Sequence, residues 1–184
     1  MSNTTLLVIG LIALVVVVAL VVAFFVFRRR QQQQRLEMAR EEYGPEYERL
    51  AEERGSETEA EKELRERRER VEDQIQPLSR ESRRRYEEEW QRVERTFLDD
   101  PAGSLDEADR VVEQILIERN FPTDSRQEAS EGVGVVYSGV VEDFREAQRI
   151  HQETTGSEGS GADLEDMRQA IQKYRSVYQR LTEG

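Results

Sequence analysis

The stretch YEEEWQRVERTF, residues 86–97, decides the fold class of this chain of 184 residues. Its four large apolar side chains recur at spacings of four, three and four residues, which is the period of one face of an α helix. They are Tyr86, Trp90, Val93 and Phe97. Charged residues occupy most of the other positions, so the predicted helix is amphipathic and needs other helices to cover its apolar face.

Three further apolar stripes of the same period follow toward the C-terminus. They consist of Leu105, Ala108, Val112, Ile115 and Leu116, then Tyr137, Val140, Val141, Phe144, Ala147 and His151, and finally Leu164, Met167, Ile171, Tyr174, Tyr178 and Leu181. A capping box from Ser104 to Glu107, after a turn at residues 99–103, is expected to start the second helix. Residues 128–134 fit no single element, and residues 156–161 are predicted to form a Gly/Ser loop. Because four amphipathic helices can enclose one core, we expect an all-α protein with a small four-helix-type domain at residues 79–184.

Residues 28–78 are predicted to be a charged helical connector. A helix is expected from Pro45, which suits a first helical turn, to about residue 54. Ser56 and Glu59 then match a capping box, and nearly every residue from 57 to 76 favours helix. The apolar positions of that helix are Ala60, Leu64, Val71 and Ile75. This stripe is too thin for a fully packed core helix, so the helix either rests on the edge of the domain or forms a seam between two copies.

The sequence LLVIGLIALVVVVALVVAFFVF, residues 6–27, predicts a single transmembrane helix. Eighteen of its 22 residues are Leu, Ile, Val or Phe, and residues 1–27 contain no Lys, Arg, Asp or Glu. A helix of this length spans roughly 33 Å, and its insertion is favoured by roughly 5–11 kcal/mol. A cleaved signal peptide is the alternative, but it would carry a basic start and a small-residue cleavage site, and neither is present.

Four arginines on one side of this segment predict its orientation. Arg28, Arg29, Arg30 and Arg35 follow the apolar stretch, whereas residues 1–5 carry no basic side chain. The positive-inside rule therefore places the short stub of residues 1–5 outside the cytoplasmic (inner) membrane of the cell and the C-terminal domain in the cytoplasm. The lipid bilayer is thus the first partner that the sequence predicts.

Composition excludes several classes of function. The net charge of −12 argues against a nucleic-acid partner, which requires a basic face. The chain has no Cys and one His, so thiolate zinc sites, disulfides and multi-histidine metal sites are excluded. The glycines of residues 132–139 match neither a dinucleotide nor a phosphate loop. We therefore expect no cofactor, no resident metal and no assignable catalytic residue.

Two kinds of titratable group need a separate explanation. His151 is the one side chain that ordinarily titrates near neutral pH, but a lone His on a half-apolar face is usually a packing residue. Acidic clusters at residues 99–100, 106–109 and 163–166 lack the ligand pattern of a calcium-binding loop and lie where helices start. Carboxylates stabilise that end of a helix, so helix capping explains them and divalent-ion binding is the alternative.

Aromatic residues of the last two predicted helices suggest one candidate binding surface. They are Tyr137, Phe144, Tyr174 and Tyr178. These side chains either belong to the core or line a groove that receives a helix of a partner.

Several segments together resemble a bacterial family. They are YGPEYER at residues 43–49, RERRERVE at 65–72, PLS at 77–79, FLDDP at 97–101 and DLEDMRQA at 163–170, with Tyr86 and Trp90. The chain is similar in these segments to uncharacterised membrane-anchored helical proteins of actinobacteria and proteobacteria, which often carry only the label "secreted protein". The resemblance covers roughly residues 36–182. It implies a helical fold and no known activity, cofactor or catalytic residue.

These observations favour a single-pass membrane protein that displays a helical domain as a scaffold or interaction module. Its partner would be another protein or a second copy of the chain. The alternative is an enzyme that uses carboxylates and a divalent ion for a reaction that the sequence does not define. A stator-like stalk is disfavoured because Gly44, Gly55 and Pro77 interrupt any continuous helix.

Overall fold

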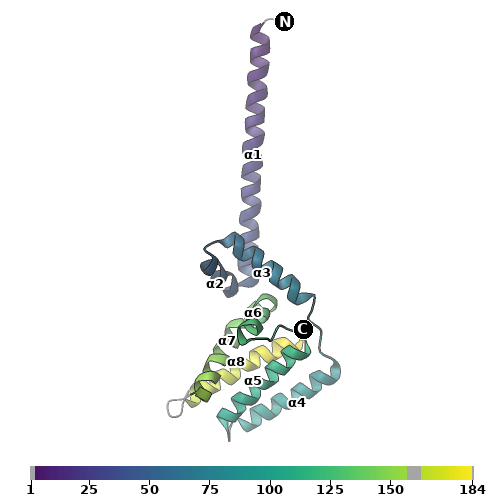
Figure 1. The fold of residues 1–184 in the computed structure, drawn as a ribbon, viewed down its shortest axis with the longest axis vertical. Helices are drawn as coiled ribbons and strands as arrows, with labels where there is room; N and C mark the ends of the chain where they lie inside the picture. The colour runs from purple at the N-terminus through teal and green to yellow at the C-terminus, as the bar shows by residue number, and fades with distance from the viewer. Residues whose placement is uncertain (1–2, 157–162, 184) are drawn as a thin grey trace. The chain divides into compact units, whose positions relative to one another are not determined.

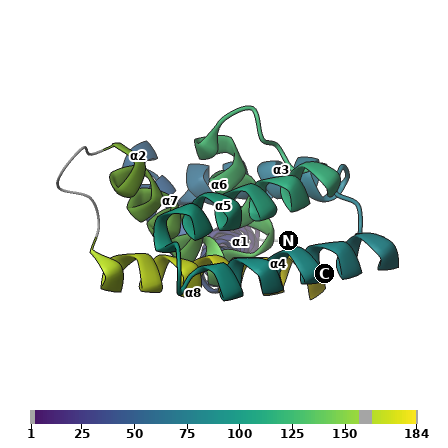
Figure 2. The same ribbon diagram turned by 90° about the horizontal axis from the view of Figure 1, so that it is seen from below.

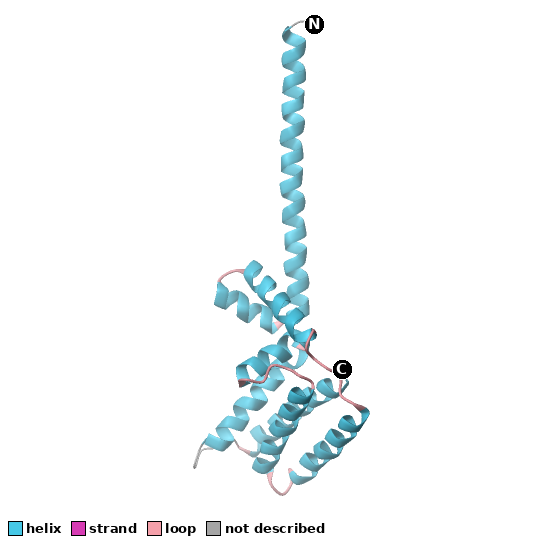
Figure 3. Cartoon of the chain, turned by 45° about the vertical axis from the view of Figure 1, so that its right-hand side comes forward, coloured by secondary structure: helices cyan, strands magenta, loops and turns pink. Residues whose placement is uncertain are grey.

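In the computed structural model, residues 3–156 and 163–183 have a described backbone, and residues 20, 22–154 and 163–183 also have described side chains. Every regular element in these ranges is helical (Figure 3). The all-α prediction is therefore confirmed for the described residues. Most of the predicted loop at residues 156–161 lies outside them.

The helices follow one another with short connections (Figure 1). They are α1 (Asn3–Tyr43), α2 (Pro45–Arg54), α3 (Glu57–Glu72), α4 (Arg80–Thr96), α5 (Pro101–Glu118), α6 (Arg126–Val136), the 3-10 turn η1 (Ser138–Val140), α7 (Val141–Gly156) and α8 (Leu164–Glu183). The chain divides into two compact units, Met1–Glu41 and Glu42–Gly184.

The first unit consists of α1 up to Glu41. Within the part of the chain that the structure describes, no helix is both long and apolar enough to cross a membrane. Residues 1–19 and 21, which make up most of the transmembrane segment predicted at residues 6–27 and all of the stub, lie outside the residues with described side chains.

The second unit is built on a helical bundle. Helices α5, α7 and α8 pack against one another, and α4 packs against α5 (Figures 1 and 2). These are the four helices that the apolar stripes predict. Fully buried side chains from all four fill the space between them, among them Val93, Leu105, Ala147 and Leu181.

Helices α2, α3 and α6 form a smaller group beside this bundle. Helix α3 packs against α2 and α6, and α6 packs against α7. Ala60 and Leu64 of α3 are fully buried, as are Tyr47 and Leu50 of α2. Residues 42–78, which the sequence assigned to a connector, therefore belong to the same compact unit as the bundle. A thin apolar stripe is sufficient here because Ala60, Leu64 and Val71 are all buried, whereas Ile75 lies beyond the end of α3 and is half-buried.

Helix ends follow local capping rules, with three differences from the predicted boundaries, one of which is that α7 begins at Val141 and not near Tyr137. Helix α5 starts one turn earlier than expected, because Asp100 accepts a hydrogen bond from the Gly103 N–H at 3.0 Å and Pro101 occupies the first helical turn. Ser104 is consequently buried inside the helix. Helix α3 ends at Glu72, before the expected residue 76. The cap of α3 is as predicted, since Ser56 accepts from the Glu59 N–H at 3.3 Å.

The buried Arg119 holds the irregular segment between α3 and α4 in place. Its Nε donates to the Gln76 carbonyl at 3.1 Å, and its Nη1 donates to the Leu181 carbonyl at 2.8 Å. The Gln76 N–H donates back to the Arg119 carbonyl at 2.8 Å. One guanidinium thus joins the end of α5, the segment before α4 and the last turn of α8.

Candidate functional site

A groove between α4 and α8 is lined by two aromatic side chains, Trp90 and Tyr178. Trp90 of α4 and Tyr178 of α8 stack at its base, with ring centroids 4.7 Å apart and an interplanar angle of 11°. The groove has a volume of about 390 Å³. Burial raises the pKa of the Tyr178 phenol, so this side chain stays neutral and presents a ring face and a hydroxyl group.

Charged side chains of both signs surround these two rings. Arg83, Glu87 and Glu94 come from α4, and Arg175 comes from α8. Arg175 lies 3.3 Å from Glu94, and Trp90 donates its indole N–H to Glu94 at 3.0 Å. An aromatic floor with a mixed charged rim can accept an apolar side chain flanked by charged ones.

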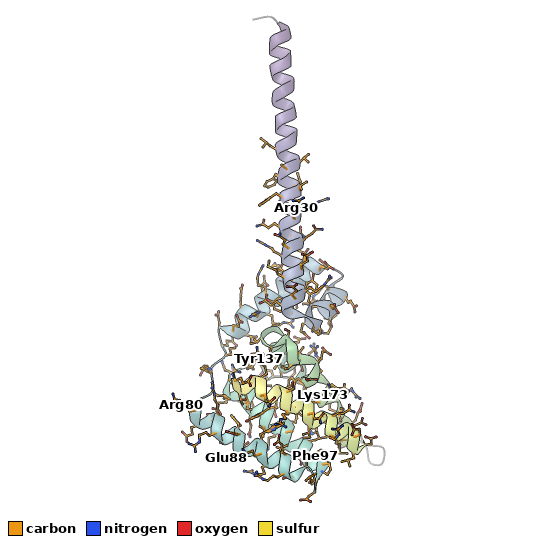
Figure 4. The ribbon with its side chains drawn as sticks, turned by 180° about the vertical axis from the view of Figure 1, so that it is seen from behind. Arg30, Arg80, Glu88, Phe97, Tyr137 and Lys173 are labelled. Carbon is orange, nitrogen blue, oxygen red and sulfur yellow. The ribbon has the colours of Figure 1, made fainter. Side chains whose placement is uncertain are left out.

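The structure separates the four aromatic residues that the sequence grouped as a candidate groove. Phe144 and Tyr174 are buried in the core, and only Tyr178 lines the α4–α8 groove. Tyr137, which follows α6 (Figure 4), lies beside Phe121 with ring centroids 6.2 Å apart. The sequence missed Trp90 as a groove residue because the heptad-like spacing assigned it to the core, and it is indeed only 4% exposed.

His151 belongs to a polar network that joins four helices. Its Nε2 lies 2.6 Å from Asp106 Oδ1, and its Nδ1 lies 3.5 Å from Asp109 Oδ2. Asp109 also accepts hydrogen bonds from the Tyr174 hydroxyl at 2.8 Å and from Arg126 at 3.1 Å. Burial, and next the charge of Asp109, raise the pKa of Tyr174 above its usual range, so the phenol remains a donor.

Two of the three acidic clusters lie at helix starts, but the prediction of a capping role was wrong for residues 106–109, because α5 begins at Pro101 and has no acid in its first turn. Asp100 caps α5, and Asp163 accepts from the Asp166 N–H at 2.9 Å at the start of α8. Among the residues that the structure describes, no group of three or more His, Asp or Glu side chains is arranged to hold a metal ion. Binding of a divalent ion stays a prediction of the sequence alone, and calorimetry with Mg²⁺ would test it.

A second feature, which the sequence did not indicate, is a fully buried carboxylate. Glu46 of α2 pairs with Arg49 at 3.0 Å and with Arg145 of α7. Gly134 of α6 makes room for it, because a Cβ at that position would lie 2.7 Å from Glu46 Cγ. In the sequence, only the glycine at position 134 hints at this close contact, and a glycine alone does not show that Glu46 is the residue packed against it.

The four predicted topology arginines lie on α1 in the first unit, where Arg30 is labelled in Figure 4. They are exposed and take no part in the groove or in the Glu46 cluster. Comparison of the chain with protein-family models, curated proteins and solved structures finds no match in any of the three. The resemblance to the bacterial family therefore stays a prediction, and any function must be argued from the chain itself.

Proposed function

We propose that this protein is a single-pass membrane scaffold, in which α1 is the anchor and the unit Glu42–Gly184 is the displayed interaction domain. The observation that carries the proposal is the exposure of large apolar side chains along α1. Leu20, Val22, Phe24, Phe25, Val26 and Phe27 are each 47–68% exposed. Four of these are consecutive, so they point to all sides of the helix.

This arrangement is unfavourable in water. Exposed apolar area costs roughly 25 cal/mol for each Å², and a helix that is apolar all round is typical of a membrane span. The sequence of residues 6–27 extends the same composition toward the N-terminus without a charge. A helical backbone continues through this stretch, which supports the anchor because only a helix satisfies its own backbone groups in lipid.

Extraction of cell membranes tests the anchor. Wild-type protein should remain in the membrane after alkaline carbonate treatment. The triple variant Val15→Arg, Val18→Arg and Val22→Arg adds roughly 8–12 kcal/mol to the insertion free energy, which is comparable to the whole of it, and should be released. Gln33→Arg, which adds a charge beyond the apolar segment, should stay bound. Release of the wild type would contradict the anchor.

The α4–α8 groove is the surface that we assign to the partner in this proposal, and an amphipathic helix of another protein is its occupant. One apolar side chain of that helix would contact Tyr178 and Trp90, and its flanking charges would pair with the mixed rim. A photo-crosslinking amino acid at Gln91, beside the groove, should give one discrete adduct in cells. Arg83→Glu together with Arg175→Glu should abolish it. An adduct that survives this charge reversal would exclude the groove.

A further inference from the structure

Helices α2, α6 and α7 of the second unit line an open surface pocket that is rich in arginine. Its volume is about 300 Å³, at the lower end of the range for small-molecule sites. Its lining includes Arg49, Arg126, Arg145 and Arg149, with Glu131 as the one acidic residue. The lining thus contains four arginines and one acid, while six further carboxylates pair with these arginines from outside it.

The buried Glu46 fixes two of these arginines. It pairs with Arg49 and Arg145 from opposite elements, and its side chain is fully buried. Burying a carboxylate costs several kcal/mol unless its partners compensate it, so this acid restricts both guanidinium groups to one arrangement. The absence of a side chain at Gly134 leaves space for the Glu46 side chain. Two arginines held in this way lose less side-chain entropy when they bind a ligand.

The four arginines have more N–H donors than their carboxylate partners use. Apart from Glu131, the acids that pair with the four arginines are outside the pocket lining. Each guanidinium has five N–H groups. Arg49 Nε is buried and has no hydrogen-bond partner among the described residues. Because this nitrogen has almost no accessible surface, a ligand in the pocket would be held by the terminal N–H groups of the arginines instead.

Neutral donors complete the wall. Ser130, nearly buried, donates to Gln148 Oε1 at 3.2 Å, which occupies the amide oxygen and leaves the NH₂ group of Gln148 as a donor. Gln127 and Arg126 belong to the first turn of α6, where the helix dipole favours negative charge. Several forked donors around one small volume match the oxygens of a phosphate group.

We propose that this pocket binds a small soluble ligand through a phosphate or diphosphate group. Arg49 and Arg145, preset by Glu46, form its floor, and Arg126 and Arg149 close on the phosphate oxygens. Glu131 is the residue that opposes binding. It lies 3.8 Å from Arg49 and 2.7 Å from Arg67, and it competes with the ligand for the Arg49 guanidinium. The site is independent of the membrane anchor and of the α4–α8 groove.

Calorimetry on the full-length protein in a phosphate-free sugar detergent tests the proposal, with inorganic pyrophosphate as the probe. Wild-type protein should bind it at low salt. Arg149→Gln should weaken the affinity about tenfold, the usual effect of one charged hydrogen bond. Arg168→Gln is the matched control. Its side chain is 52% exposed against 53% for Arg149, and it pairs with Glu165 as Arg149 pairs with Glu146, but it does not line the pocket.

A second variant separates binding from folding damage. Glu131→Gln removes the opposing charge and should tighten pyrophosphate binding, a gain that misfolding cannot produce. Short-chain phosphatidylglycerol in the same detergent distinguishes the source of the phosphate. The proposal is overturned if millimolar pyrophosphate gives no heat, if Arg149→Gln and Arg168→Gln behave alike, if Glu131→Gln fails to tighten binding, or if only the lipid binds.

Discussion

At the scale of single residues, the structure assigns roles that charge patterns alone do not reveal. Glu46 and Asp109 are ordinary acids in a sequence with 39 of them. Each becomes special because helices distant in sequence place donors around it, namely Arg145 for Glu46 and Tyr174 for Asp109. Spacing within one helix cannot predict such contacts. Sequence analysis could therefore find the apolar core residues but not the buried acid beneath the arginine pocket.

Asp109 should matter more to stability than Asp106, although both face His151 on the same helix. Asp109→Asn replaces an acceptor of two hydrogen bonds in a largely buried position and should cost about 1–3 kcal/mol. Asp106 is 60% exposed at its side chain, and Asp106→Asn should cost less than about 1 kcal/mol. Urea unfolding followed by fluorescence of Trp90, the only Trp, measures both. Equal losses would mean that the Asp109 network contributes nothing beyond an exposed ion pair.

Glu118 should make the free energy of unfolding depend on pH in the acidic range. A hydrogen bond from Ser82, followed by contacts with Tyr86 and Arg85, lowers the pKa of this carboxyl below its ordinary value of 4.5. A lowered folded-state pKa means that the contribution is present above pH 4.5 and is lost as the pH falls through the folded-state pKa. Glu118→Gln should therefore flatten the decline of unfolding free energy below pH 4.5. The exposed Glu113 of the same helix is the control, and Glu113→Gln should leave the decline unchanged.

At the scale of elements, the apolar period predicts helices well and their environment less well. The bundle helices α4, α5, α7 and α8 all occur where their stripes are centred, but α7 begins at Val141, so Tyr137 and Val140 of its predicted stripe lie outside it. Helix α6 did not stand out because its buried face consists largely of Ala, Ser, Gly and Val, which give no strong stripe. The start of α5 was misplaced because Asp100 and Ser104 are both good caps, and the Pro at position 101 favours the earlier one.

Helix α3 shows why a sparse stripe can still hold a helix in a core. Leu64 is fully covered, so Leu64→Ala should create a cavity and lower the unfolding free energy by about 2–5 kcal/mol. Leu98→Ala is the matched control, because Leu98 is 86% exposed. Its effect should stay below about 0.5 kcal/mol. If the two substitutions had equal effects in urea titrations, α3 would be a solvated connector after all.

At the scale of the whole molecule, the charge distribution predicts which side of the membrane each end of the chain occupies. Residues 1–27 carry no charge, residues 28–95 carry 18 basic and 20 acidic side chains, and residues 96–184 carry 9 and 19. The basic residues thus lie nearest the proposed anchor in sequence, where an anionic leaflet would attract them. Because no Cys is present, single thiols can be introduced without a background.

Thiol labelling in whole cells tests this orientation. A membrane-impermeant maleimide should label Ser2→Cys in intact spheroplasts, whereas Leu98→Cys, at an exposed position, should react only after permeabilisation. By the positive-inside rule, the predicted orientation depends on Arg28, Arg29, Arg30 and Arg35. Replacing all four by Gln, and adding three Lys after Ser2, should invert the pattern if these charges set the topology. Labelling of Leu98→Cys in intact spheroplasts would place the helical domain outside, and would remove cytoplasmic proteins from its possible partners.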